Sequence, residues 1–217
     1  MDIKTTSQTN DQNWDALRTE FKLSERQIEQ FSLYLDFLLK SNEEFNLTAI
    51  VQPKEVIAHH FYDSLAVSKC IDIPAMRNIC DVGTGGGFPG IPLKILYPEV
   101  PMILLEVNKK KINFLWKTID LLKLDVVEVC DMDWRTFLRK TDWDIDLFLS
   151  RASLHTDELM RLLAPGSRYK NAQLVYWASK DWQIGKKETP FFDREESYTV
   201  KGKLRRLIFF KNKTSKE

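Results

Sequence analysis

Hydrophobic positions along this chain follow one spacing before residue 78 and another after it. In the first part they recur every three or four residues, the spacing of one face of an amphipathic helix, at Ile28, Phe31, Leu35 and Leu38. Ser24, with Gln27 three residues later, forms a capping box that would start this helix, and we expect the helix to end near Ser41. Pro53 suits the first position of a second helix.

From residue 78 onward, short apolar runs alternate with segments that are long enough for helices. The runs lie at residues 79–82, 102–107, 126–130, 145–149 and 174–178. This alternation predicts a mainly parallel sheet with helices on both faces. Two further apolar stretches, one ending at Val200 and one starting at Leu207, are separated by a turn at Gly202 without a helix, so they predict an antiparallel hairpin.

These patterns divide the chain into two regions. Residues 1–72 are predicted to form a small helical region, in which the polar residues 1–13 are expected to be disordered. Residues 73–217 are predicted to form an α/β region with a Rossmann-like, mainly parallel sheet. No low-complexity linker separates the two regions, so we expect them to pack together as one unit.

Most glycines of the chain gather in residues 78–93, which read NICDVGTGGGFPGIPL. This stretch has the order of a strand, a glycine-rich turn and a helix entrance. Glycine permits positive φ and leaves no Cβ to keep a ligand away from the backbone. Gly85, Gly87 and Gly90 match the dinucleotide-binding pattern G-x-G-x-x-G, with Glu106 as a possible ribose partner. This interpretation predicts that the protein is a nucleotide-binding dehydrogenase.

The same turn fits a second cofactor class. Asp81, Gly83, Gly85 and Gly87 read acid-x-Gly-x-Gly-x-Gly, which resembles the first motif of class I S-adenosylmethionine-dependent methyltransferases. In that class the glycines would pass beneath an amino-acid tail instead of a pyrophosphate. The sequence offers no obvious hydride-transfer residue, so it favours the methyltransferase over the dehydrogenase.

Composition narrows the function classes further. Of the 217 residues, 43% are hydrophobic and 29% are charged, which indicates a globular protein. The polar N-terminus and the lack of a long apolar run argue against a signal peptide or a membrane span, so we expect a cytoplasmic protein that has no membrane partner. The three cysteines are interpreted as free thiols. The three histidines show no ligand spacing with them, so no metal site is predicted.

The formal net charge of +1 does not by itself indicate a nucleic-acid partner. Basic residues nevertheless cluster at Lys109–Lys111 and again over Lys201–Lys216, where no acidic residue occurs. Each cluster is either a solvated face or a contact surface for an anionic partner.

Four stretches of the sequence together resemble one family. They are NLTAI at 46–50, HHFYDSL at 59–65, DVGTGGGFPGIPL at 81–93 and SRA at 150–152. In order and spacing they are similar to the bacterial small-subunit ribosomal RNA guanine-N7 methyltransferases. The resemblance implies a class I methyltransferase fold that ends in an antiparallel hairpin, with S-adenosyl-L-methionine as cofactor. It further implies methylation of guanine N7 in 16S ribosomal RNA, with that RNA or the small ribosomal subunit as partner. A monomer is the default, since nothing in the sequence suggests a second interface.

The resemblance also implies roles for individual residues. Gly83 and Phe88 match positions that contact the cofactor, and Glu106 would hold the ribose hydroxyls. Arg151 of the SRA element matches an active-site arginine. With the motif residues and the segment after the third strand, the predicted cofactor-binding set is Asp81, Gly83, Gly85, Gly87, Phe88, Glu106, Asp133, Trp134 and Arg135.

The segment after the third strand departs from the family, which tends to have Ala-Glu where this chain has Trp134 and Arg135. Trp134 either stacks on the adenine or lies in the core, and Asp133 either supplies the missing carboxylate or is solvated. If this pair closes the cofactor crevice, the chain is a non-catalytic RNA-binding module. Other changes on the RNA side leave open a methyltransferase of the same fold that acts on another RNA or on a small molecule.

Guanine N7 carries a lone pair and no proton, so its methylation needs no general base, and we expect residues that grip the base instead. His60, Asp63 and Ser64 stand at i, i+3 and i+4, on one face of a helix. They form either a polar patch over the cofactor or a buried group that ties the helical region to the sheet. We predict His60, Asp63 and Arg151 as catalytic residues. Ser64, Arg151 and Lys180 are predicted to bind the substrate.

Overall fold

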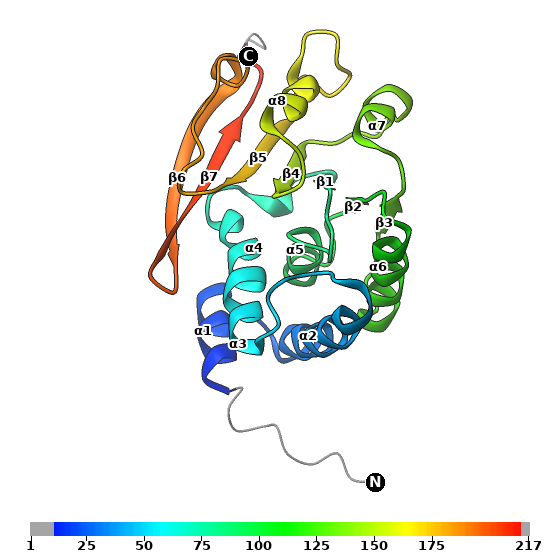
Figure 1. The fold of residues 1–217 in the computed structure, drawn as a ribbon, viewed down its shortest axis with the longest axis vertical. Coiled ribbons are helices and arrows are strands. Elements are labelled where there is room, and N and C mark those ends of the chain that lie inside the picture. The colour runs from blue at the N-terminus through cyan, green and yellow to red at the C-terminus, as the bar shows by residue number, and fades with distance from the viewer. Residues whose placement is uncertain (1–10, 214–217) are drawn as a thin grey trace.

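The computed structural model describes residues 11–213, and a seven-stranded sheet forms its centre (Figure 1). The strands follow the order β3-β2-β1-β4-β5-β7-β6. β1 to β5 pair in parallel, whereas β7 pairs antiparallel with both β5 and β6. The predicted parallel sheet with a closing antiparallel hairpin is confirmed. The strands are β1 (Ile79–Val82), β2 (Met102–Leu105), β3 (Val127–Cys130), β4 (Leu147–Arg151), β5 (Gln173–Ala178), β6 (Phe192–Val200) and β7 (Lys203–Phe210).

Helices cover both faces of the sheet, α1, α2, α5 and α6 toward the bottom of Figure 1 and α7 and α8 toward its top. The α-helices are α1 (Asp11–Phe21), α2 (Glu25–Phe45), α3 (Pro53–Val56), α4 (Asp63–Leu65), α5 (Gly90–Leu96), α6 (Lys109–Leu122), α7 (Trp134–Lys140) and α8 (Thr156–Leu159). A π-helix, η1 (Ile57–Tyr62), joins α3 to α4. The short 3-10 helices are η2 (Ala66–Lys69), η3 (Ile73–Ala75), η4 (Met160–Leu163) and η5 (Thr189–Phe191).

Two hydrophobic cores form because successive strand residues point to opposite faces of the sheet. Ile79 and Leu104 belong to the core beneath α1, α2, α5 and α6. Their neighbours Cys80 and Ile103 belong to the core beneath α7 and α8. Leu35 of α2 lies in the same core as Ile79, so the N-terminal helices and the sheet share one apolar interior.

Helix α2 runs about one turn further than the sequence indicates. The capping box at Ser24 forms as predicted, but the helix ends at Phe45 and not near Ser41. The side chain of Asn42 exchanges two hydrogen bonds with the backbone of Thr48, at 2.8 and 2.9 Å, and so holds the last turn against the loop that follows.

Helix α1 starts inside the stretch for which disorder is expected. Residues 1–10 lie outside the described residues, but Asp11 begins α1, so the expectation is wrong for residues 11–13. Trp14 and Leu17 are buried in the N-terminal core, and the Trp14 ring stacks on Phe61 at 6.1 Å between centroids. Burial of these apolar side chains anchors the helix.

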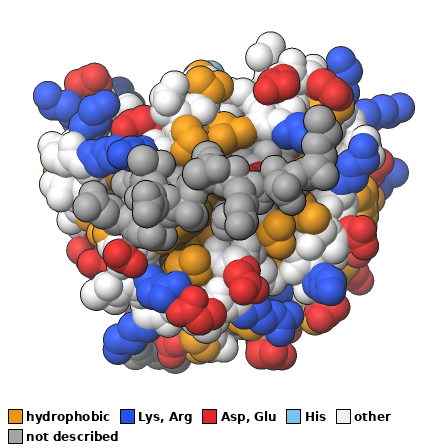
Figure 2. All heavy atoms as spheres, turned by 90° about the horizontal axis from the view of Figure 1, so that it is seen from below, with side chains coloured by type: hydrophobic (Ala, Val, Ile, Leu, Met, Phe, Trp, Pro, Cys, Tyr) orange, Lys and Arg blue, Asp and Glu red, His pale blue; other side chains and the backbone are white. Residues whose placement is uncertain are grey.

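The face seen in Figure 2 lies at the N-terminal end of the molecule. Acidic and basic side chains are interspersed there among hydrophobic ones, so side chains of one charge do not gather in the visible part of this face.

Candidate functional site

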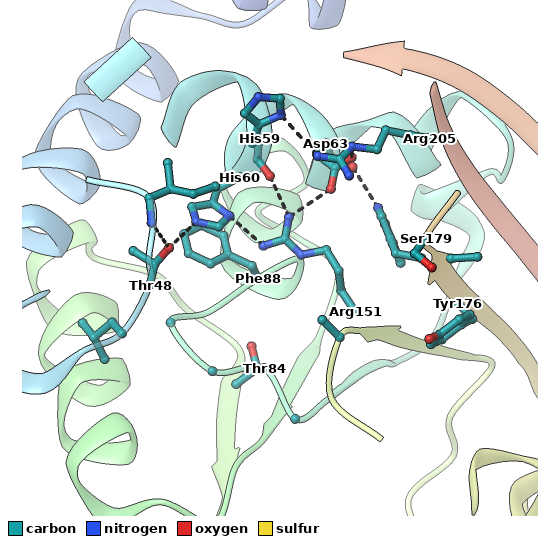
Figure 3. Close-up of a pocket in the computed structure, with 18 of the residues that line it drawn as sticks. Thr48, His59, His60, Asp63, Thr84, Phe88, Arg151, Tyr176, Ser179 and Arg205 are labelled. Atoms are coloured by element: carbon teal, nitrogen blue, oxygen red, sulfur yellow. Dashed lines mark hydrogen bonds and ion pairs between the residues drawn. The ribbon is translucent and has the colours of Figure 1, made fainter. Parts of the chain in front are cut away.

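A cavity of about 480 Å³ opens beyond the carboxyl ends of β1, β4 and β5 (Figure 3). Ligands bind at this edge in sheets of this kind. The wall combines the glycine-rich turn after β1 with η1, the end of β4 and strand β7. Its lining residues include Thr48, His59, His60, Asp63, Gly83, Thr84, Gly85, Gly86, Phe88, Lys111, Arg151, Tyr176, Ser179, Arg205 and Arg206.

The glycine-rich turn needs glycine for conformation and for close approach. Gly83 and Gly85 have φ of 67° and 61°, in the left-handed region. A Cβ on Gly83 would lie 2.4 Å from Cβ of Ser153, whereas one on Gly85 would meet no atom nearer than 4.0 Å. Gly83 therefore packs against the protein, while Gly85 leaves open space at the cavity.

Asp81 shapes this turn from inside the protein. Its Oδ2 accepts hydrogen bonds from the Thr84 hydroxyl at 2.6 Å and from the Gly90 backbone N–H at 2.8 Å. Burial raises the pKa of Asp81 to about 6, and its buried Oδ1 has no hydrogen-bond partner among the described residues. Asp81 thus joins β1 to the start of α5 and leaves one oxygen for a further donor.

Glu106, at the end of β2, holds the turn from the other side. Its Oε2 accepts from the Gly85 N–H at 3.0 Å, and its Oε1 accepts from the N–H groups of Val107 and Asn108 at 2.9 Å. The carboxylate is buried beside the turn and is not part of the cavity wall described above. Binding of ribose hydroxyls by Glu106 stays a prediction.

An aromatic stack supports the next part of the turn. Phe88 lies between Tyr34, at 5.4 Å between ring centroids, and His60, at 4.5 Å. The buried hydroxyl of Tyr34 donates to the Gly86 carbonyl, and the Phe88–Pro89 peptide bond is cis. Helix α2 thus fixes the position of a turn that follows it by some fifty residues in the sequence.

Arg151 connects β4 to the helical region across the cavity (Figure 3). Its Nη1 donates to the His59 carbonyl and to Asp63 Oδ2, both at 3.1 Å. Its Nη2 donates to Nδ1 of His60 at 3.0 Å, and the guanidinium carbon lies 5.2 Å from the Phe88 ring centroid. The structure therefore places Arg151 in direct contact with the other two predicted catalytic residues, Asp63 and His60. Helix η1 supplies His59 and His60.

The hydrogen bonds of His60 define its tautomer. Arg151 can only donate, so Nδ1 of His60 must accept and Nε2 must carry the proton. That proton is donated to Oγ1 of Thr48 at 2.7 Å, and Oγ1 also accepts from the Ile50 N–H at 3.0 Å. Burial, together with the charge of Arg151, lowers the pKa of His60 to about 3. His60 is therefore neutral at physiological pH, and its one lone pair is occupied.

The lowered pKa of His60 makes a testable contribution to stability. The unfolded chain binds a proton near pH 6.5, whereas the folded protein does so only near pH 3. The free energy of unfolding should therefore fall as pH drops from about 6.5 to about 3, by up to about 1.4 kcal/mol per pH unit. Denaturant unfolding of the wild type and of His60→Gln across this range measures the difference.

Asp81 has the opposite dependence, because its raised pKa gives stability that is lost as pH rises through about 6. Both proteins contain Asp81, so the difference between them isolates His60. Parallel stability curves for the two proteins would contradict the neutral, buried state of this imidazole.

Asp63 is held from several sides. Its Oδ1 accepts from the Tyr198 hydroxyl at 2.7 Å and forms an ion pair with Arg205 at 3.6 Å, and its backbone carbonyl accepts from Trp177 Nε1 at 3.0 Å. Burial and the neighbouring carboxylate of Asp63 raise the pKa of Tyr198, which stays protonated as the donor. Asp63 thus ties η1 and α4 to β4, β5 and the hairpin, as the second alternative for this helix face predicts. Asp63 also lines the cavity, and its place over the cofactor stays a prediction.

Other predicted residues lie away from the cavity wall. Ser64 is fully buried and does not line the cavity, so nothing in its position supports contact with a substrate. Lys180 is exposed and follows the lining residue Ser179. Its role in substrate binding stays a prediction.

The segment after β3 forms the start of helix α7. Trp134 is buried in the core beneath α7, where its Nε1 donates to the Glu158 carbonyl at 3.0 Å. Asp133 caps α7 by accepting from the N–H of Arg135 and of Thr136 at 3.0 Å. Arg135 pairs with Glu158 at 3.0 Å. The core alternative for Trp134 holds, because its ring is enclosed by other side chains and its position gives no support to stacking on adenine. Cofactor contacts of Asp133 and Arg135 stay predictions.

Several lining residues escaped the sequence analysis. Thr48 lies in one of the stretches that carry the resemblance, and Lys111 and Arg205 lie in the two basic clusters, so a signal for each was present without a role. No sequence pattern marks Tyr34 or Tyr198, whose hydroxyls reach the site from α2 and β6.

The sequence predicts neither a metal site nor a membrane span, and the structure bears on both predictions for residues 11–213. In this range no group of three or more potential metal-ligating side chains comes together. None of the helices in the described part of the chain has the length and apolar character to cross a membrane.

Comparisons with known proteins agree on one family. The profile of the family rRNA small subunit methyltransferase G matches residues 27–208. Ribosomal RNA small subunit methyltransferase G of Aster yellows witches'-broom phytoplasma is 44% identical over 114 residues, which cover 52% of this chain and 54% of that protein. The protein of the same name from Bacillus subtilis is 39% identical over 145 residues, covering 66% of this chain and 61% of that protein. The alignments therefore span less than two thirds of either relative.

A solved structure shares the fold at low sequence identity. The complex of an MtNAS mutant with S-adenosylmethionine superposes with a TM-score of 0.60 and 15% identity, and the match covers 95% of this chain and 80% of that chain. The fold is thus the class I methyltransferase fold.

Proposed function

Because the chain belongs to the rRNA small subunit methyltransferase G family, whose profile covers residues 27–208, we propose that it methylates N7 of a guanine in 16S ribosomal RNA with S-adenosylmethionine as the methyl donor. One observation carries this proposal. A single cavity is lined both by the glycine-rich turn and by the oriented guanidinium of Arg151, so cofactor and base can meet there.

The residues around the turn fit S-adenosylmethionine in three respects. Gly85 leaves open space at the cavity wall. Asp81 Oδ1 is buried and unpartnered, and so can accept from a further donor, directly or through a water molecule. The Glu106 carboxylate lies against the same turn and retains acceptor capacity for hydroxyl groups. Bound there, the cofactor supplies an electrophilic methyl group on a positively charged sulfur.

No side chain in the Arg151 network is free to act as a general base. The Nδ1 lone pair of His60 accepts from Arg151, and the carboxylate of Asp63 accepts from Arg151 and Tyr198. This arrangement suits guanine N7, which has no proton to remove, and it suits less well a hydroxyl or an amine that must lose one. The network therefore supports catalysis by positioning.

Arg151 is the residue that we assign to the base. Three of its five N–H donors contact the His59 carbonyl, Asp63 and His60, so two remain for a ligand in the cavity. Guanine has two neighbouring acceptors, O6 and N7, on its major-groove edge. The N7 lone pair must stay free to attack the methyl group. We therefore assign Arg151 to O6 of the guanine or to an adjacent phosphate.

We further propose that the protein acts as a monomer in the cytoplasm. Membership of a family named for ribosomal RNA methylation supports this setting. The partner is then 16S ribosomal RNA, either naked or within the small subunit. Sedimentation of the purified protein tests the monomer, which a concentration-dependent dimer would contradict.

Calorimetric titration with S-adenosylmethionine, run beside NAD, tests the cofactor class. We expect micromolar binding of S-adenosylmethionine and no binding of NAD, because the sequence offers no obvious hydride-transfer residue and the cavity contains the Arg151 network. In a second step, the protein is incubated with labelled S-adenosylmethionine and unmodified 16S ribosomal RNA, either naked or assembled into the small subunit. Chain cleavage at 7-methylguanosine then maps the methylated position.

Each outcome of this experiment separates the alternatives. Binding of NAD alone would support the dehydrogenase, and binding of neither cofactor would support the RNA-binding module. Methylation of a small molecule or of another RNA alone would identify a different substrate. The burial of Trp134 already removes the main reason for the module, since its ring does not close the cavity.

A further inference from the structure

The exposed side of helix α6 carries basic and aromatic side chains beside the cavity. We call this group the α6 face. Asn113 lies three residues from Lys110 and Trp116 and four residues from Lys109 and Lys117, so all five share one side of the helix. All five are exposed, and Trp116 keeps 45% of its surface accessible.

The α6 face begins at the end of the helix that borders the cavity, but on the side of the helix turned away from Lys111. Lys111, in the first turn of α6, lines the cavity, and its Nζ lies 4.0 Å from the position that a Cβ on Gly85 would take. At about 1.5 Å per residue, Lys117 lies roughly 9 Å further along the helix than Lys111. A polymer that enters the cavity with one unit would pass the first turn of α6, at Lys109 and Lys110, before it reaches the rest of the α6 face.

The lysines of the α6 face are free, whereas several basic residues of the other cluster are paired. Among the residues that the structure describes, the side chains of Lys109, Lys110 and Lys117 form no ion pair and no hydrogen bond. In the hairpin, by contrast, Lys201, Arg205 and Arg206 each pair with a carboxylate. The charge on the α6 face is therefore available to an anionic partner.

The position of Lys109 and Lys110 does not serve the stability of the helix. The N-terminal end of a helix carries a partial positive charge, so cations in the first turn are unfavourable there. Asn108 already caps this end by accepting from the N–H groups of Lys110 and Lys111, at 3.0 and 3.3 Å. An anion would consequently meet the lysine side chains and not the backbone N–H groups of the helix.

We propose that the α6 face binds an unpaired strand of RNA that leads out of the cavity, with its lysines at phosphates and Trp116 stacked on a base. This inference rests on the proposed function. Surfaces that hold single strands combine a basic track with aromatic rings on which bases stack. A paired helix would offer phosphates but no free base face, so Trp116 favours an unpaired strand.

Binding to an unmodified 16S ribosomal RNA transcript at several salt concentrations tests this proposal. We expect Trp116→Ala to weaken RNA binding roughly tenfold without changing the salt dependence, because it removes one stacked base. Trp116→Phe, which keeps a ring, should restore most of the affinity. Lys110→Gln combined with Lys117→Gln should lower the slope of log affinity against log salt by about 0.7 for each phosphate that the protein no longer neutralises.

Matched controls are available on other elements. Leu33→Ala removes a side chain that is 47% exposed, as Trp116 is 45% exposed, and Lys140→Gln with Lys170→Gln removes two exposed lysines. These controls should bind RNA like the wild type. Affinity for S-adenosylmethionine should be the same in every variant, since none of the changed residues lines the cavity.

The outcomes separate this proposal from the proposed function. One outcome is that the wild type methylates the transcript and the α6-face variants bind it with wild-type affinity and salt slope. The α6 face is then a solvated surface, and this inference is overturned while the proposed function stands. If the control variants lose as much affinity as the α6-face variants, the binding is general and the inference is overturned as well. If the wild type binds S-adenosylmethionine but neither binds nor methylates the transcript, the proposed function itself fails.

Discussion

Replacing Arg151 by Ala is expected to lower kcat for RNA methylation by about 100- to 1000-fold, while the affinity for S-adenosylmethionine changes by less than about threefold. Arg151 is already oriented by Asp63, His60 and the His59 carbonyl, so no reorganisation is needed when a guanine enters. Single-turnover methylation of 16S ribosomal RNA and calorimetric titration of the cofactor measure the two quantities.

Two further variants show whether such a loss is specific. Arg151→Ala leaves the buried Asp63 without its closest charged partner, which costs stability. Arg151→Ala combined with Asp63→Asn should recover stability but not activity, because the guanidinium is still missing. Arg139→Ala removes an exposed arginine outside the cavity and should methylate like the wild type. Equal losses of cofactor affinity and of kcat in Arg151→Ala would mean that Arg151 only holds the fold.

Replacing Gly85 by Ala is expected to weaken the binding of S-adenosylmethionine by about ten- to a hundredfold, since a methyl group in a tightly packed site costs about 1–3 kcal/mol. A Cβ on Gly85 meets no protein atom nearer than 4.0 Å, so it would project into the cavity and not into the core. The φ of 61° adds about 1–2 kcal/mol of backbone strain. Calorimetry measures the affinity, and denaturant unfolding measures the stability.

Gly202→Ala is the matched control for Gly85→Ala. Gly202 lies in the turn of the β6–β7 hairpin with φ of 73°, and nothing lies within 4 Å of the position that its Cβ would take. Both variants should therefore lose similar stability, whereas Gly202→Ala should keep the affinity for the cofactor. If Gly85→Ala binds S-adenosylmethionine as tightly as Gly202→Ala does, the turn is not part of the cofactor site.

Local patterns were sufficient for most of the secondary structure. The apolar runs predicted at 79–82 and 174–178 became β1 and β5 almost to the residue, and the hairpin around Gly202 formed as expected. Such apolar runs are typical of strands that are buried on both faces of the sheet, and a few consecutive residues are enough to recognise them. The end of α2 was misplaced because the hydrogen bonds of Asn42 to Thr48 depend on a loop that no periodicity describes.

Two residues that were predicted to contact the cofactor show what the sequence does not determine about the site. Gly83 and Trp134 both carried a prediction of cofactor contact, yet Gly83 lines the cavity and Trp134 fills the core on the other face of the sheet. Sequence position placed each residue after its strand. It did not determine which way the side chain of Trp134 turns, because that depends on Phe137 and Phe148, against which the ring packs.

The succession of strands and helices along the chain and the glycine-rich turn follow from the sequence, because each depends on residues that are close together in the chain. The family follows from four short stretches between residues 46 and 152. The assembly of the site, in contrast, depends on the packing of distant segments. Arg151 meets His60 across 91 residues, Tyr198 meets Asp63 across 135, and Tyr34 meets Gly86 across 52. These contacts form when β4, the hairpin and α2 pack around one edge of the sheet, and no local spacing encodes a distance of that kind.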